Sequence, residues 1–118
     1  MAIIKNIEIN GTEVPFKASA AIPRIYRTRF GRDLFVDLNR LMNDLNKNDA
    51  NESGLALESL EIFENIAYLM AKHADPTVPD TPEAWLDRFD IFSIYQILPQ
   101  IIELWRLNTD TEVSPKKE

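Results

Sequence analysis

"DIFSIYQILPQIIELW", residues 90–105, is the most apolar stretch of this chain of 118 residues. Its apolar part, roughly fifteen residues long, is shorter than the ~20 that a helix needs to span a bilayer. Gln96, Gln100 and Glu103 also interrupt it. The net charge of −6 leaves no basic face of the kind that holds a helix on a membrane surface. We therefore expect a helix within a globular domain and no membrane contact.

Apolar side chains cover more than one side of this predicted helix. One line contains Ile91, Leu98 and Ile102, and a second group extends round the helix through Ile94, Ile97, Ile101 and Leu104. A helix that is apolar on several sides is buried on several sides. Core packing and contact with a second chain both remain open as explanations. Pro99 should kink the helix, because the carbonyl group of Tyr95 loses its hydrogen-bond donor.

The rest of the sequence predicts a hairpin followed by helices. Alternating apolar residues surround Asn10-Gly11, the strongest signal for a tight hairpin turn. Apolar residues then recur at helical spacing over residues 19–31, 32–47 and 55–73, and a short helix follows Thr81. The predicted fold is mainly α with a small N-terminal β-hairpin. It is a single compact domain of about five helices over residues 1–107, with a disordered polar tail over residues 108–118.

The sequence offers little for catalysis. It has no cysteine, a single histidine, His73, and three isolated glycines. A metal site needs three or four ligands, and Asp75 beside His73 does not supply them. Asp87 and Asp90 flank Phe89, but no second catalytic group accompanies them. We therefore predict no catalytic, cofactor-binding or metal-binding residue, and a protein that is not an enzyme.

Four arginines interleave with Tyr26 and Phe30 in "RIYRTRFGR", residues 24–32. One interpretation is a nucleic-acid patch, used by a small regulatory protein. The other is charge pairing with the acidic remainder of the chain, which the net charge of −6 favours. Arg29 falls on the apolar side of the predicted helix. We expect it to be a buried or interface charge paired with a carboxylate, because an unpaired buried charge is costly.

Partner-facing or self-association residues are predicted on the apolar stretch. Large aromatic and aliphatic side chains at helical spacing are suited to that role, and we assign it to Phe92, Tyr95, Leu98, Ile101 and Trp105, together with Arg29.

Three stretches resemble, in order, the tail assembly chaperones of long-tailed, siphovirus-type phages and prophages of Gram-positive bacteria. The first is the hairpin leading into "YRTRFGRDLFVDL", residues 26–38. The second is "LESLEIFENIAYLMAKHADPTVPDTPEAWLDRFD", residues 57–90, and the third is "IFSIYQILPQIIELWRLN", residues 91–108. The likeness lies in the combined arrangement and length, without a catalytic motif.

This resemblance implies a chaperone that binds the tape measure protein, keeps it soluble and helps recruit tail tube subunits. It also implies a homo-oligomer in the cytoplasm of the host bacterium, absent from the mature virion. In this family a ribosomal frameshift often appends a C-terminal extension. Pro115-Lys116-Lys117 could be encoded by a slippery run of adenines, which the gene sequence would test.

Overall fold

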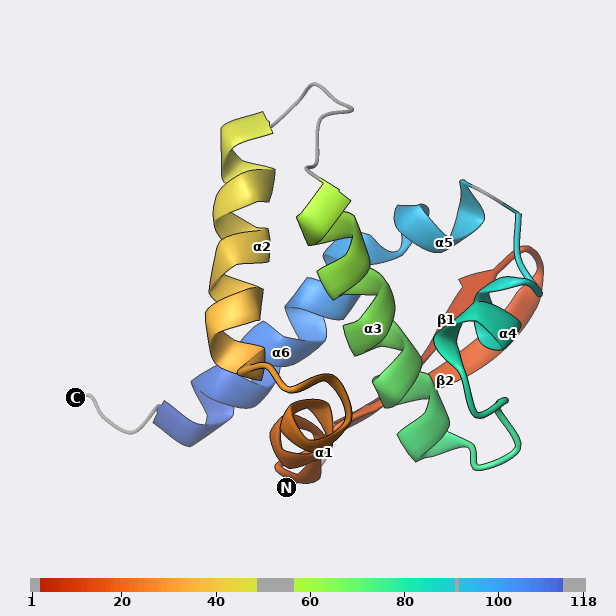
Figure 1. Cartoon of the computed structure of the whole chain (residues 1–118), viewed down its shortest axis with the longest axis horizontal. Coiled ribbons are helices and arrows are strands. Elements are labelled where there is room, and N and C mark those ends of the chain that lie inside the picture. The colour runs from red at the N-terminus through yellow and green to blue at the C-terminus, as the bar shows by residue number, and fades with distance from the viewer. Residues whose placement is uncertain (1–2, 49–56, 91, 114–118) are drawn as a thin grey trace.

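The computed structural model describes residues 3–48, 57–90 and 92–113, and leaves aside the side chains of residues 46–48, 57 and 107–113 (Figure 1). The predicted class is confirmed: the chain is mostly helical and begins with an antiparallel hairpin. The described elements are β1 (Ile3–Ile9), β2 (Thr12–Ala18), α1 (Ala21–Phe30), α2 (Leu34–Asn48), α3 (Leu57–Ala74), α4 (Pro82–Leu86), α5 (Ser93–Gln96) and α6 (Leu98–Val113).

The hairpin turns at the two residues that the sequence indicates. Asn10 and Gly11 both have positive φ, 55° and 81°, as a tight two-residue hairpin turn requires. The strands then pair from Ile9 with Thr12 to Ile3 with Ala18. Because side chains alternate across a strand, one face of the hairpin is buried, through Ile7, Ile9, Phe16 and Ala18.

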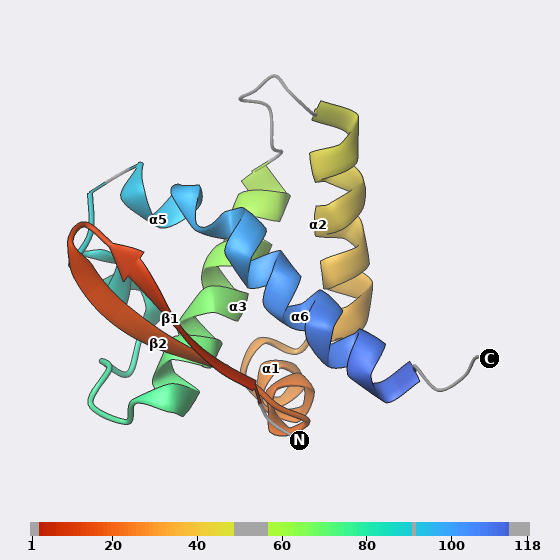
Figure 2. The same ribbon diagram turned by 180° about the vertical axis from the view of Figure 1, so that it is seen from behind.

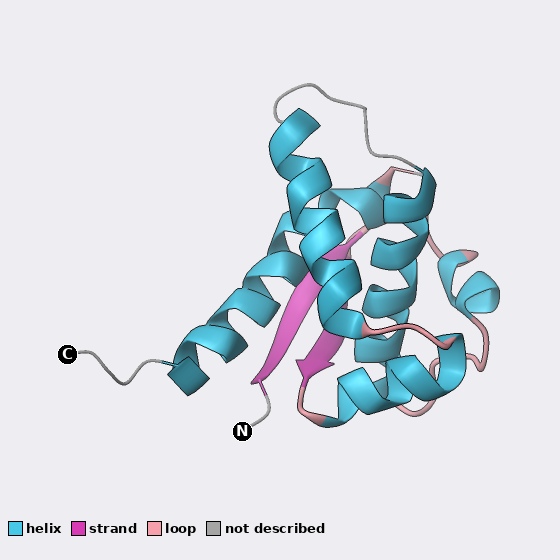
Figure 3. Ribbon diagram, turned by 60° about the vertical axis from the view of Figure 1, so that its left-hand side comes forward, coloured by secondary structure: helices cyan, strands magenta, loops and turns pink. Residues whose placement is uncertain are grey.

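Helix α3 lies at the centre of the fold. Figures 1 and 2 show α2 on one side of it and the hairpin across the other, and Figure 3 shows the two strands as one narrow sheet among the helices. The middle of α3 is buried on almost every side, through Ile62, Phe63, Ile66, Ala67, Tyr68, Leu69, Met70 and Ala71. Helix α3 therefore joins the hairpin to the other helices in one core.

The prediction of one helix kinked at Pro99 is wrong, because the helix is interrupted just before Pro99 and two separate helices form. Helix α5 ends at Gln96, and α6 begins at Leu98. This places Pro99 in the first turn of α6, where a missing N–H costs little. The two helices can therefore take different directions (Figure 2), and the apolar stretch packs as two segments.

The predicted tail begins too early. Helix α6 continues through residues 108–113 and ends at Val113, whereas a polar tail was expected from residue 108. The segment Asn108–Val113 contains neither glycine nor proline, and Pro115 is the first residue that opposes helix. Polarity alone was therefore a poor guide to the helix end. Residues 114–118 lie outside the described part of the chain.

Within the described residues, none of the helices combines the length and the apolar character needed to cross a membrane.

Candidate binding surface between α2 and α6

Three of the predicted contact residues are part of the core. Leu98, Ile101 and Trp105 are 5%, 1% and 6% exposed. The indole Nε1 of Trp105 donates a hydrogen bond to the Sδ atom of Met70 on α3, at 3.2 Å. These side chains hold α6 against the rest of the fold, so in this conformation a partner does not reach most of their surface.

Tyr95 and Phe92 lie in contrasting environments. Tyr95 is half-buried, its ring centroid lies 5.9 Å from that of Phe63, and its hydroxyl group donates to the carboxylate of Glu64. This hydrogen bond, together with burial, raises the pKa of Tyr95 to about 12. Phe92 is 74% exposed just before α5. Of the five predicted apolar contact residues, Phe92 alone is mostly exposed.

Arg29 was predicted to be a buried or interface charge paired with a carboxylate; it is not buried within this chain, whereas its role at an interface stays a prediction. Its side chain is exposed, and Nη2 donates to the main-chain carbonyl oxygen of Asp80. Its guanidinium carbon lies 5.1 Å from the ring centroid of Tyr68. Asp80, in the loop between α3 and α4, supplies the carbonyl group, and Tyr68 on α3 supplies the aromatic face, so Arg29 has partners without being buried.

The basic segment is partly occupied by contacts within the chain. Arg32 donates two hydrogen bonds to the carboxylate of Asp37, from Nε at 2.6 Å and from Nη2 at 2.9 Å. It also contacts Glu58 at 3.3 Å. Arg24 and Arg27 are exposed on α1. Charge pairing thus accounts for Arg32, while two arginines of this segment project into solvent.

Asp37 joins α1 to α2 from a buried position. It is 2% exposed and accepts a hydrogen bond from the hydroxyl group of Tyr26, at 2.6 Å, besides those from Arg32. Burial alone would raise the pKa of Asp37, but the hydrogen bonds from Arg32 and Tyr26 outweigh it, and the pKa lies below its usual value. Burial, followed by the bond to Asp37, raises the pKa of Tyr26.

An apolar groove of about 430 Å³ runs between α2 and α6. Its walls are Phe35, Leu38, Asn39 and Met42 from α2, and Ile102, Trp105 and Arg106 from α6. Phe35 is 56% exposed, and its ring meets that of Trp105 edge to face, with centroids 6.4 Å apart. The groove therefore brings one predicted contact residue, Trp105, next to an aromatic side chain that a partner can reach.

Phe35 was not among the predicted site residues, although the sequence carries a signal for it. The core stripe of α2 runs through Leu34, Leu38 and Leu41, and Phe35 lies off this stripe. Val36 beside it is also 56% exposed. Two large apolar residues outside the buried face of an amphipathic helix indicate a contact surface.

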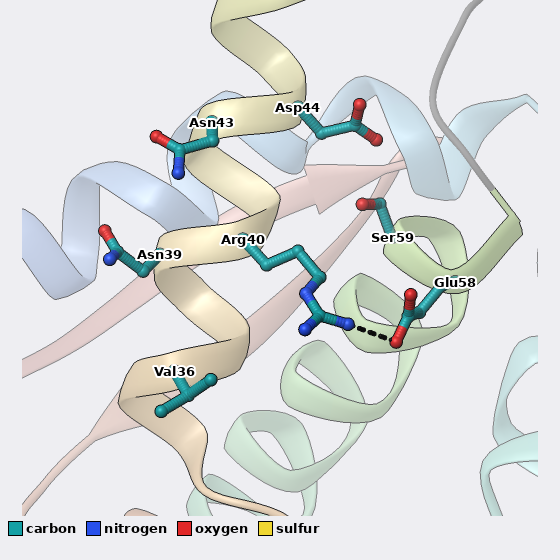
Figure 4. Close-up of a pocket in the computed structure, with 7 residues that line it drawn as sticks. All are labelled: Val36, Asn39, Arg40, Asn43, Asp44, Glu58 and Ser59. Carbon is teal, nitrogen blue, oxygen red and sulfur yellow. Dashed lines mark hydrogen bonds and ion pairs between the residues drawn. The ribbon is translucent and has the colours of Figure 1, made fainter.

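A second hollow, of about 460 Å³, lies on the other side of α2, against α3 (Figure 4). Its lining is mostly polar, and consists of Val36, Asn39, Arg40, Asn43, Asp44, Glu58 and Ser59. Arg40 and Glu58 form an ion pair across it. Because these two charges neutralise one another and most of the wall is polar, this hollow suits an apolar partner less well than the groove does.

Over residues 3–48, 57–90 and 92–113, histidine, aspartate and glutamate side chains form no group of three that could hold a metal ion. Compared with known proteins, the chain matches no family model, no curated protein and no solved structure.

Proposed function

We propose that this chain is a phage tail assembly chaperone. It binds the tape measure protein, keeps that long helical protein soluble and helps to recruit tail tube subunits. It works by binding equilibria, without catalysis and without a cofactor. Its place of action is the cytoplasm of the infected bacterium, and it is absent from the finished virion. The order of the three resembling stretches supports this proposal, and so does the apolar groove.

The observation that carries the proposal is the exposed aromatic residue at the groove. Phe35 keeps more than half of its surface in solvent, directly beside Trp105 and Met42. Single exposed apolar residues are common, but an exposed aromatic ring at the edge of an apolar groove is typical of a protein-binding site. A chaperone for a helical protein needs such a groove to cover the apolar stripes of its client.

Co-expression tests this function directly. The tape measure protein of the same genome is produced alone and with this chain, and its soluble and co-purifying fractions are measured. We expect it to precipitate alone and to become soluble and co-purify with the chain. A tape measure protein that stays insoluble beside the folded chain, and beside any frameshifted longer form, would refute the function. Detection of the chain in purified virions would contradict its proposed absence from them.

The alternative function is a small nucleic-acid-associated regulator that uses residues 24–32. Arg24 and Arg27 are exposed and favour it, whereas Arg32 is held by Asp37. A gel shift at two salt concentrations separates the functions, because phosphate contacts weaken steeply with salt. We expect no salt-sensitive shift.

A further inference from the structure

We propose that the groove between α2 and α6 is the docking site for a single amphipathic helix of another protein. That helix inserts apolar side chains at positions i, i+3 or i+4, and i+7, and places a carboxylate against Arg106. The inference rests on the proposed function, in which this helix belongs to the tape measure protein. It adds the site, the form of the bound segment and its charge.

The two walls of the groove have the spacing of helix faces. On α2, the lining residues Phe35, Leu38, Asn39 and Met42 fall at positions i, i+3, i+4 and i+7. On α6, Ile102, Trp105 and Arg106 fall at i, i+3 and i+4. Each wall is therefore one continuous stripe along a helix. A third helix laid between two such stripes packs its ridges into their grooves, which is the usual way helices associate.

The buried and exposed parts of the lining are arranged as a binding groove needs. Leu38, Ile102 and Trp105 are 5%, 7% and 6% exposed and form a rigid base. Met42 is half-buried, and Phe35 stands at the edge with 56% of its surface exposed. Methionine adapts to differently shaped apolar side chains, and an aromatic ring offers a large contact area. Covering these two residues removes apolar surface from water.

Charge at the groove fits an acidic residue of the partner. Arg106 is exposed and is the one charged residue in the lining. Among the ion pairs formed by the described residues, none involves Arg106. The chain as a whole carries −6, so a cation at an apolar groove stands out from its surroundings. A carboxylate flanking the apolar stripe of the bound helix would pair with Arg106 and set its direction.

Residues 114–118, which follow α6, are a poor candidate for filling this groove, because Ser114-Pro115-Lys116-Lys117-Glu118 contains no large apolar side chain. A second copy would have to present an exposed apolar helix stripe. The large apolar residues that are exposed in the described part of the chain are Ile4 on β1, Phe35 and Val36 side by side on α2, and Phe92 just before α5. No two of them lie three, four or seven positions apart on one helix, so they do not form the exposed stripe that the groove accepts.

Two neighbouring residues of α2 give a matched pair for the test. Phe35 and Val36 are both 56% exposed, but Phe35 lines the apolar groove and Val36 lines the polar hollow (Figure 4). Each is replaced in turn by the photo-crosslinking amino acid p-benzoylphenylalanine, in the chain co-expressed with the tape measure protein. We expect a strong crosslink to the tape measure protein from position 35 and a much weaker one from position 36, because the photoreactive group reacts only with groups that it contacts. Mass spectrometry of the crosslinked peptide should identify a segment with the predicted apolar spacing.

Substitutions provide the second arm. Phe35→Asp should abolish co-purification, and Val36→Asp should preserve it, with both variants folded by circular dichroism. Arg106→Glu should weaken binding by at least about fivefold at low salt, because it removes one exposed ion pair and adds repulsion from the carboxylate of the partner. Arg106→Lys should retain most of the affinity. Arg27→Glu, an equal charge change at an exposed position of α1, is the control.

The outcomes separate this inference from the function on which it rests. If the unmodified chain solubilises the tape measure protein but position 35 crosslinks no better than position 36, the proposed docking site is wrong, although the proposed function is supported. A crosslink from position 35 to a second copy would also overturn the inference. If neither the unmodified chain nor any frameshifted longer form solubilises the tape measure protein, the proposed function fails, and this inference fails with it.

Discussion

Replacing Asp37 with alanine should destabilise the fold strongly, although this residue carries no predicted function. Asp37 is 2% exposed and accepts three hydrogen bonds, two from Arg32 and one from Tyr26. The substitution removes a buried anion and its bonds at the junction of α1 and α2. We expect the loss to appear in the free energy of unfolding.

The magnitude follows from the exposure of the two partners. Tyr26 is fully buried, and its hydroxyl group would be left without its acceptor, at a cost of about 1–3 kcal/mol. The side chain of Arg32 is 42% exposed, so water replaces much of what it loses, and its share is about 1 kcal/mol. Together these give about 3 kcal/mol, close to the lower end for breaking a buried charged pair.

Urea unfolding followed by circular dichroism measures this loss. Glu58→Ala is the matched control: Glu58 also contacts Arg32, but its side chain is 50% exposed, and we expect a loss below about 1 kcal/mol. Tyr26→Phe on top of Asp37→Ala should cost little more, because it removes the hydroxyl group that had lost its acceptor. The reasoning is refuted if Asp37→Ala costs no more than Glu58→Ala, or if the Tyr26 and Asp37 substitutions are additive.

Three further predictions concern the core residue Trp105, the helix end at Gly31 and the pH dependence due to His73. Trp105→Ala should lower the free energy of unfolding by about 3–5 kcal/mol and Phe92→Ala by less than ~0.5, as urea titration would show; comparable losses would contradict the assignment of Trp105 to the core. Gly31 has φ of 69° with nothing within 4 Å of an added Cβ, so Gly31→Ala should cost about 1 kcal/mol through backbone strain alone, measured by thermal unfolding. Burial, and then Lys17, lower the pKa of His73 below its usual ~6.5, so the unfolded chain binds more protons between the two values. Stability should therefore fall as pH drops through ~6.5, and His73→Gln should flatten this dependence in urea midpoints taken at pH 7.5 and 5; an unchanged slope would exclude His73 as its source.

Much of the fold could be predicted because its signals are local. Positive φ at Asn10 and Gly11, and the left-handed residue that ends α1 at Gly31, follow from what those residues tolerate. Thr81 caps α4 by accepting from the N–H group of Ala84. In each case the residue lies within a few positions of the turn or helix end that it determines.

Other features depend on which segments meet in space, and the sequence alone did not show this. The partner of Arg29 lies in a loop 51 positions away, where the carbonyl group of Asp80 accepts its hydrogen bond. Pro99 was expected to bend one helix, but its own position in a first turn let the chain begin a new one. The local sequence pattern was compatible with a buried or an exposed Arg29, and with one kinked helix or two helices at Pro99, and the packing of the folded chain decides between them.

The candidate site was only half predictable for a related reason. Helical spacing identified Trp105 as an anchor, but the same spacing describes a core residue and a surface residue. Phe35 lies in a helix whose core stripe was complete without it. Recognising it requires knowing that α6 passes beside α2 and leaves the ring 6.4 Å from Trp105.

Most apolar side chains of residues 90–105 are therefore buried within the chain. This changes where we expect a partner to bind. Ile101 and Trp105 hold α6 in place, so altering them tests folding before it tests assembly. In the proposed binding mode, a partner instead meets the edge that α6 forms with α2, where Phe35 and Arg106 are exposed. Substitutions at this edge leave the core intact. Loss of assembly in a stable Phe35→Asp variant is thus the result that would distinguish a binding groove from a core helix.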